Sequence, residues 1–318
     1  MFKRILVPLD GSSLAECVLP HVIAVSQAFG SGVLLLSAVN HEGFTDGHPV
    51  DPVDWQARRA GAETYLQEIA GKLEKMGLTT EWAILEGPPA ESIVDTSHSH
   101  GIDLIVLSTH GQAGLTHWTS GSVVRKVVQR AFGSLLIVRA FRWEISKGLS
   151  AASYRRIFLP LDGSQRAECV LPLAIRIAQF HEAEVTLAHA VSKPEMPCRC
   201  PMSEEDSELQ RRLVERNRKV ANEYLESIGS RLPPGFRTRL VVSMDVASSL
   251  HDLARIEASD LVVLSAHGYS GQRKWPYGSV CRSFIEYGTS PLLVLQDLSY
   301  EEVEATEAEL VAQEHKGH

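Results

Sequence analysis

Two glycine-rich segments have the composition of a phosphate-binding loop. The first spans 111–122 and leads into a helical pattern. Glycine lets backbone amides approach phosphate oxygens closely, and the N-terminus of a helix favours an anion. A plain strand-to-helix connection is the simpler interpretation of either segment alone, but the pattern occurs twice, which favours a binding site. The candidate residues are Gly111, Gly114, Gly121, Ser122 and Val123 in the first copy, and Gly268, Gly271, Gly278, Ser279 and Val280 in the second.

An aspartate at the end of a short apolar run is the second candidate in each copy. Asp10 follows Pro8 and Leu9, and Asp162 follows the equivalent pair. A carboxylate there can accept hydrogen bonds from an adenine amino group or a ribose hydroxyl. The alternative is an aspartate that caps the next helix or closes a turn with the glycine after it. A glycine loop at the adjacent strand end would favour the ligand interpretation.

Histidine and arginine recur beside both loops. His110 and His267 precede the loop glycine, but no nearby residue forms a base–orienter pair with either, so we expect structural histidines. Arg125 and Arg282 lie four residues after Gly121 and Gly278. Each arginine has two interpretations of equal weight: contact with a phosphate, or an ion pair with an acidic surface group.

Several familiar catalytic motifs are absent from the sequence. Neither copy has Gly-x4-Gly-Lys-Ser/Thr, or a compact Gly-x-Gly-x-x-Gly after its first strand, and there is no nucleophile elbow.

Cys198 and Cys200, flanked by methionines, could bind zinc with help from His189 or His251. A loop with two free thiols is the simpler alternative, because tetrahedral zinc usually needs four ligands.

The chain contains an internal duplication. The segment Pro8-Leu9-Asp10-Gly11-Ser12 returns 152 residues later, and Ser108-Thr109-His110-Gly111 returns as Ser265-Ala266-His267-Gly268. A period this long indicates two complete domains rather than a solenoid. We predict domains over 1–145 and 153–298, followed by an acidic C-terminal tail over 299–318.

Apolar runs alternate with helical patterns in both copies. Because the runs are nearly continuous in Val, Ile and Leu, they predict buried parallel strands. The fold class is therefore α/β: two tandem doubly wound domains, each a five-stranded parallel sheet with helices on both faces. Ligands of such sheets bind beyond the carboxyl ends of the strands. The predicted strands are 4–9, 33–39, 79–85, 104–108 and 135–139, then 156–161, 184–191, 237–242, 261–265 and 292–295, and the first predicted helix is 13–29.

Composition excludes several classes of protein. The 318 residues are 44% hydrophobic and 22% charged, as in a soluble globular protein, and the net charge of −8 argues against nucleic acid as a partner. No apolar run approaches the ~20 residues needed to span a membrane. The N-terminal residues lack the pattern of a signal peptide, and five cysteines favour a reducing compartment, so we expect a cytoplasmic location.

The repeated motifs resemble those of the universal stress protein family. The family pattern Gly-x2-Gly-x9-Gly-Ser/Thr occurs in this sequence with Ser108 and Ser265 in place of the first glycine. The resemblance covers about residues 1–298 and implies a tandem universal stress protein. It implies ATP, ADP or AMP as ligand, with Mg²⁺ as an optional companion, an aspartate beside adenine, and Val39 or Val191 packed on the base. Met244 replaces a glycine of the first copy, which favours the first site.

The resemblance leads to a functional expectation with two alternatives. We expect an adenine-nucleotide-binding regulator or binding module of the stress response, with at most weak ATP hydrolysis and no assigned catalytic residue. The alternatives are a slow Mg-dependent ATPase, and a nucleotide-free scaffold whose second domain binds a metal or small ligand. The last strand of each copy resembles the segment through which single-domain members pair. We therefore expect intrachain pairing of the two domains, and a homodimer of chains is a further possibility.

Overall fold

The computed structural model describes residues 1–39, 52–110, 122–140, 149–195, 203–269 and 276–298. Two compact units divide the chain: Met1–Ser153, termed the first domain, and Tyr154–Asp297, the second domain. Four predicted features lie outside the described residues. These are the first glycine loop up to Gly121, Gly271 of the second loop, the Cys198 and Cys200 pair, and the acidic tail.

The first domain is built on a five-stranded parallel sheet in the order β3-β2-β1-β4-β5. Its strands alternate with helices along the chain. The elements are β1 (Arg4–Pro8), the 3₁₀ turn η1 (Ala15–Val18), α1 (Leu19–Phe29), β2 (Gly32–Val39), α2 (Pro52–Glu74), β3 (Thr80–Glu86), α3 (Pro89–Ser99), β4 (Leu104–Ser108), α4 (Ser122–Arg130) and β5 (Ser134–Val138).

The second domain repeats this architecture with the strand order β10-β9-β6-β7-β8, again parallel throughout. Its elements are β6 (Arg156–Pro160), α5 (Gln165–Glu168), α6 (Leu171–His181), β7 (Glu184–Ser192), α7 (Glu204–Gly229), β8 (Phe236–Ser243), α8 (Val246–Ile256), β9 (Leu261–Ser265), α9 (Ser279–Tyr287) and β10 (Leu292–Leu295). The predicted doubly wound α/β fold is confirmed in both domains.

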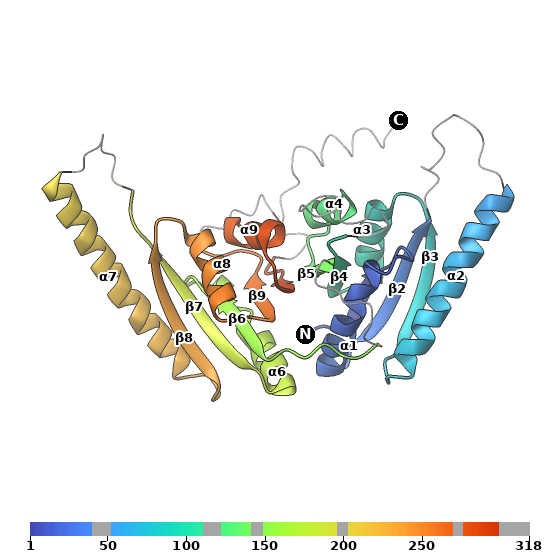
Figure 1. Cartoon of the computed structure of the whole chain (residues 1–318), viewed down its shortest axis with the longest axis horizontal. Helices are drawn as coiled ribbons and strands as arrows, with labels where there is room; N and C mark the ends of the chain where they lie inside the picture. Colours follow the sequence, from blue (N-terminus) through green and yellow to red (C-terminus); the bar gives the residue numbers. More distant parts are fainter. Residues whose placement is uncertain (40–51, 111–121, 141–148, 196–202, 270–275, 299–318) are drawn as a thin grey trace. The chain divides into compact units, whose positions relative to one another are not determined.

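Helices cover both faces of each sheet. Right-handed crossovers place α1 and α2 on one face and α3 and α4 on the other, because the chain crosses back over the sheet after β3. The contacts agree: α2 packs on β2 and β3, and α3 packs on α4, as Figure 1 shows. In the second domain α7 packs on β7 and β8, and α8 packs on α9. With both faces covered, strands such as β1 and β5 are apolar along nearly their whole length.

The predicted helix over 13–29 was wrong in one respect, because the structure divides it. A 3₁₀ turn ends at Val18, and α1 begins at Leu19 with Pro20 in its first turn. Proline has no N–H to donate to the carbonyl four residues earlier, and its ring clashes with that carbonyl, so a helix start at Pro20 is favoured over a continuous helix through it. The same division occurs in the second domain, where Pro172 lies in the first turn of α6.

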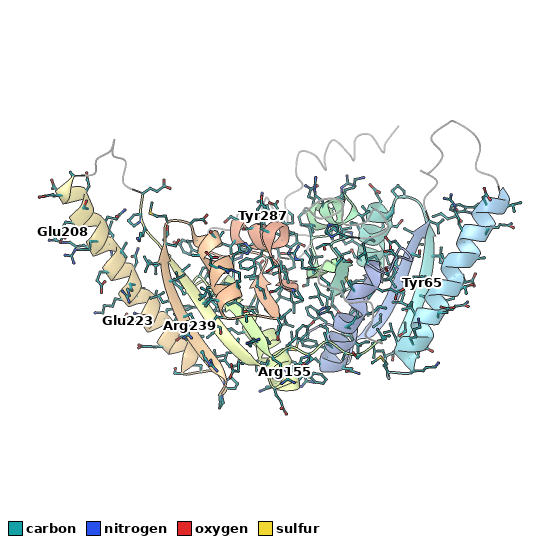
Figure 2. All side chains as sticks on the ribbon, in the orientation of Figure 1. Tyr65, Arg155, Glu208, Glu223, Arg239 and Tyr287 are labelled. Atoms are coloured by element: carbon teal, nitrogen blue, oxygen red, sulfur yellow. The ribbon has the colours of Figure 1, made fainter. Side chains whose placement is uncertain are left out.

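The long helix α7 carries a highly charged outer surface, on which Figure 2 labels Glu208 and Glu223. Glu208 accepts hydrogen bonds from Arg211 at 2.9 Å and Arg212 at 2.7 Å. These bonds lower the pKa of Glu208 to about 2. Exposed ion pairs add little stability.

No helix in the described part of the chain is both long and apolar enough to cross a membrane.

Acid should destabilise the first domain through His21, a residue of α1. Burial lowers the pKa of His21 to about 4, whereas an unfolded histidine titrates near 6.5. Between these values only the unfolded chain holds the proton, so stability falls as the pH falls, by up to about 1.4 kcal/mol per pH unit.

Urea unfolding followed by tryptophan fluorescence tests this expectation, because four of the five tryptophans lie before residue 153. His21→Gln should flatten the pH dependence between about pH 6.5 and 4. The exposed His100 offers the matched control. An equal flattening in His100→Gln would contradict the role of His21.

Candidate functional site

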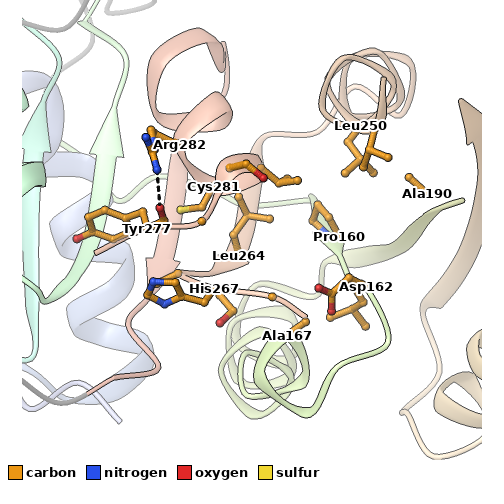
Figure 3. A pocket seen from close by; sticks show the side chains of 18 residues that line it. Pro160, Asp162, Ala167, Ala190, Leu250, Leu264, His267, Tyr277, Cys281 and Arg282 are labelled. Atoms are coloured by element: carbon orange, nitrogen blue, oxygen red, sulfur yellow. Dashed lines mark hydrogen bonds between the residues drawn. The ribbon is translucent and has the colours of Figure 1, made fainter. Parts of the chain in front are cut away.

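The second domain contains a cavity of about 330 Å³ at the carboxyl ends of β6 and β9, beside the first turn of α9. Figure 3 shows Asp162 and Leu250 on one side of it and His267 and Tyr277 on the other. The cavity brings together five of the residues predicted for the second copy, which lie far apart in the sequence: Asp162, Gly268, Gly278, Ser279 and Val280.

One wall of the cavity is apolar. It is formed by residues of β6, β7, β9 and α8, namely Pro160, Ala190, Val246, Leu250 and Leu264. The predicted contact residue Val191 is buried but is absent from this wall, where its neighbour Ala190 lies instead. Successive side chains of a strand point to opposite faces of the sheet, so only one of the two can face the cavity.

Asp162 is held by backbone and side-chain donors at the rim. One carboxylate oxygen accepts the Ser164 N–H at 3.0 Å and the Ser164 hydroxyl at 2.6 Å. The other accepts the N–H of Tyr269 at 2.5 Å. The turn-closing interpretation of this aspartate therefore holds locally, while the same carboxylate also lines the cavity. Asp162 thus joins the end of β6 to the start of the glycine loop.

At two positions of the cavity wall, a side chain would come too close to neighbouring atoms, which explains why glycine stands there. A Cβ on Gly268 would collide with the Asp162 carboxylate. Gly278 donates its N–H to the Ala266 carbonyl at 2.7 Å, and its Cβ position lies 3.4 Å from that oxygen. The beginning and the end of the loop are therefore tied to the same stretch of backbone after β9.

The polar end of the cavity is the first turn of α9. Gly278 caps this helix, and Ser279, Val280 and Cys281 follow it in the lining. The first amides of a helix have no partner within the helix and attract anions. Arg282 also lines the cavity, and its guanidinium lies 3.4 Å from the Tyr277 carbonyl oxygen (Figure 3).

Comparison with known proteins shows the family to which the chain belongs. The model of the universal stress protein family matches the chain twice, over residues 1–139 and 153–296. The chain belongs to the universal stress protein family. Universal stress protein MJ0531 of Methanocaldococcus jannaschii is 30% identical over 145 residues, which cover 44% of this chain and 83% of that protein.

Solved structures support the tandem fold. A universal stress protein from Archaeoglobus fulgidus aligns over 92% of this chain and 98% of its own, with 18% identity and a TM-score of 0.62. A functionally unknown protein, PA1789 from Pseudomonas aeruginosa, aligns over 98% of both chains, with 13% identity and a TM-score of 0.66. At these identities the likeness shows the fold alone.

Both universal stress protein domains have serine at the first glycine of the family pattern. Ser108 Oγ lies 3.0 Å from the Leu14 carbonyl and 2.7 Å from the His110 carbonyl, and it accepts the Cys17 thiol at 3.3 Å. Ser265 Oγ accepts the Cys169 thiol at 3.6 Å. The extra hydroxyl is thus bonded within the protein. Burial raises the pKa of Cys17 to about 11, which keeps the thiol protonated and unreactive at neutral pH.

The first universal stress protein domain repeats the aspartate turn. Asp10 accepts the Ser12 N–H at 3.0 Å and the Ser12 hydroxyl at 2.6 Å. Pro8 ends β1, and Leu9 is buried and donates its N–H to the Leu36 carbonyl. Val39 ends β2, half-buried, while Ser122 and Val123 begin α4. The loop glycines Gly111, Gly114 and Gly121 lie outside the described residues.

The expectation for His267 needs revision. His267 does have an orienting partner, because its Nδ1 lies 2.8 Å from Asp297 Oδ1, 30 residues away at the end of another strand. Met244, which replaces a glycine of the first copy, is 61% exposed and does not line the cavity. Nothing near His267 in the sequence indicates that Asp297 lies beside its ring.

Metal binding finds no support in the part of the chain that the structure describes. That part contains no group of three or more His, Cys, Asp or Glu residues able to hold an ion. The predicted pair Cys198 and Cys200 lies outside it.

Proposed function

We propose that this protein binds an adenine nucleotide in the second-domain cavity and uses its occupancy to select a conformation or a partner in a stress response. The residues of the cavity fit such a ligand. The apolar wall of Pro160, Ala190 and Leu250 suits a base, and the Asp162 carboxylate at the rim can accept an amino or hydroxyl hydrogen.

The observation that carries the proposal is the position of the first turn of α9. Ser279 and Val280 line the same cavity as Asp162 and the apolar wall, so a ligand that joins an apolar ring to an anion fits it from end to end. Arg282 adds a cation to the same lining. A purely apolar ligand would leave the helix terminus and Asp162 unused.

Binding rather than turnover is proposed as the main role. His267 is the histidine of the cavity wall, but its side chain has no exposed surface, and Asp297 holds its Nδ1. A general base must reach the proton that it takes, directly or through one water. By the repeat, the same proposal extends to the first domain, with Asp10 and the 111–122 loop as the equivalent residues.

Calorimetry with ATP, ADP and AMP on the full chain tests the proposal, together with mass spectrometry of whatever nucleotide survives native desalting. We expect saturable adenine nucleotide binding and weaker binding of a pyrimidine nucleotide. Asp162→Ala should weaken the second-domain site about tenfold, the loss expected for a hydrogen bond to a charged group.

Asp260 provides a matched control for Asp162. Its carboxylate accepts the N–H groups of Arg155 and Arg156 at the opposite, amino end of β6. Asp260→Asn should leave nucleotide affinity unchanged. Absence of any nucleotide binding, or equal affinity in the wild type and Asp162→Ala, would overturn the proposal.

A further inference from the structure

One buried carboxylate ties three elements together behind the second-domain cavity. Asp297 Oδ1 accepts the His267 backbone N–H at 3.1 Å and its ring Nδ1–H at 2.8 Å. Asp297 Oδ2 accepts Arg166 Nε at 2.6 Å. The side chain of Asp297 is 4% exposed and that of His267 is 0% exposed. The segment after β9, the segment after β10 and the short helix α5 therefore meet at one side chain.

The charge state of this group is set by its partners. Burial alone would raise the pKa of Asp297, but the hydrogen bond and charge of His267 and the charge of Arg166 outweigh it and hold the pKa below its ordinary value. The group is therefore a carboxylate at neutral pH, which can only accept hydrogen bonds, so His267 carries its proton on Nδ1. Loss of a buried carboxylate would leave both donors without their acceptor.

The first domain anchors the equivalent histidine differently. Ser108 pairs with Val138 in the first domain, and the equivalent Ser265 pairs with Leu295 in the second, so Ala140 stands where the second domain has Asp297. There His110 Nδ1 lies 3.0 Å from Thr109 Oγ1, and the His110 N–H is 3.4 Å from Ser108 Oγ. Both contacts come from residues next to His110 in the sequence, and alanine at position 140 offers no side-chain acceptor. The anchor of the second domain comes from another strand.

His267 lies in the backbone segment that connects the two polar features of the cavity. It stands between Ala266, whose carbonyl accepts the Gly278 N–H at 2.7 Å, and Gly268, which packs against the Asp162 carboxylate. The position of this backbone therefore sets the distance between the first turn of α9 and Asp162. These are the two polar features that a nucleotide would have to reach at once.

We propose that Asp297 is a positioning residue that sets the nucleotide affinity of the second-domain site alone, through His267. The inference rests on the proposed function. It gives one chain two sites whose affinities are set by different residues: a remote carboxylate in the second domain and a local threonine in the first.

The test is calorimetry with ATP on the full chain, with the binding lost in Gly268→Ala assigned to the second domain. Asp297→Asn should weaken that binding at least about tenfold, as loss of a supporting partner typically does, and leave the remaining binding unchanged. The ¹⁵N chemical shifts of the His267 ring nitrogens should change in this variant, because the asparagine amide carries no charge and has one acceptor oxygen where the carboxylate has two. Thr109→Ala should weaken ATP binding by the first domain and leave the second-domain binding unchanged.

Asp260→Asn separates positioning from general stability. It removes a carboxylate of the same domain that also holds backbone N–H groups, so thermal stability should fall while affinity is retained. If Asp297→Asn does not fold, Arg166→Gln removes one arm whose side chain is 32% exposed, and it should still weaken second-domain binding several-fold.

Three results keep the two proposals distinct. Absence of any ATP binding in the wild type overturns the proposed function and this inference with it. ATP binding that is lost in Gly268→Ala but unchanged in the folded Asp297→Asn or Arg166→Gln overturns the inference alone. An equal loss of affinity in Asp260→Asn also overturns it, because the effect would then be one of general stability.

Discussion

Phe158→Ala should lower the free energy of unfolding of the second domain by about 3–5 kcal/mol, the usual cost of truncating a fully buried phenylalanine. Phe158 is 0% exposed and lies on β6. It pairs with Thr186 of β7 on one side and with Val262 of β9 on the other, so it occupies the middle of the sheet. The cavity left by the ring has no neighbouring solvent to fill it and little room to collapse.

Hydrogen exchange measured by mass spectrometry on peptides from β6, β7 and β9 reports this loss for the second domain separately. Phe180 of α6 is the matched control, because it is the same residue type in the same domain but is 45% exposed. Phe180→Ala should cost much less, because its ring is already partly in water. Similar losses in the two variants would contradict the assignment of Phe158 to the core.

Strands were the part of the fold most readily predicted from sequence. Both β4 (Leu104–Ser108) and β9 (Leu261–Ser265) have the predicted bounds. Their four leading residues are buried in each case, so an apolar run marks the whole strand. The helix before β2 was less predictable, because composition favoured a helix from Ser13 while the missing N–H of Pro20 decided where α1 begins.

Residues of the candidate site could be predicted where a local sequence pattern determines their position. The turn at Asp162 and the start of α9 at Ser279 follow from local patterns, and both line the cavity. The choice between Ala190 and Val191 depends on which face of β7 turns inward, and both residues are apolar, so the sequence offers no signal. Asp297 depends on the pairing of β9 with β10, which only the folded sheet brings together.

Gly268→Ala should remove nucleotide binding by the second domain. The φ angle of Gly268 lies outside the left-handed region, so alanine carries no backbone penalty there and the effect is steric. The new Cβ would collide with the carboxylate of Asp162. That carboxylate cannot move away without breaking its hydrogen bonds to Ser164 and Tyr269, and overpacking of this kind costs about 1–3 kcal/mol.

Gly229→Ala is the matched control for this substitution. Gly229 ends α7, and a Cβ there would meet Thr238 Cγ2 at 3.8 Å, an ordinary contact. Calorimetry with ATP should therefore find second-domain binding lost in Gly268→Ala and unchanged in Gly229→Ala. Equal affinities in the wild type and Gly268→Ala would place the ligand elsewhere.

A double-mutant cycle on stability separates the collision from other causes. In the Asp162→Ala background the carboxylate that the new Cβ would meet is gone, so Gly268→Ala should cost little further stability. The coupling between the two substitutions should then approach the full cost of Gly268→Ala in the wild type. Additive losses would show that glycine is required at position 268 for a reason other than the approach of the Asp162 carboxylate.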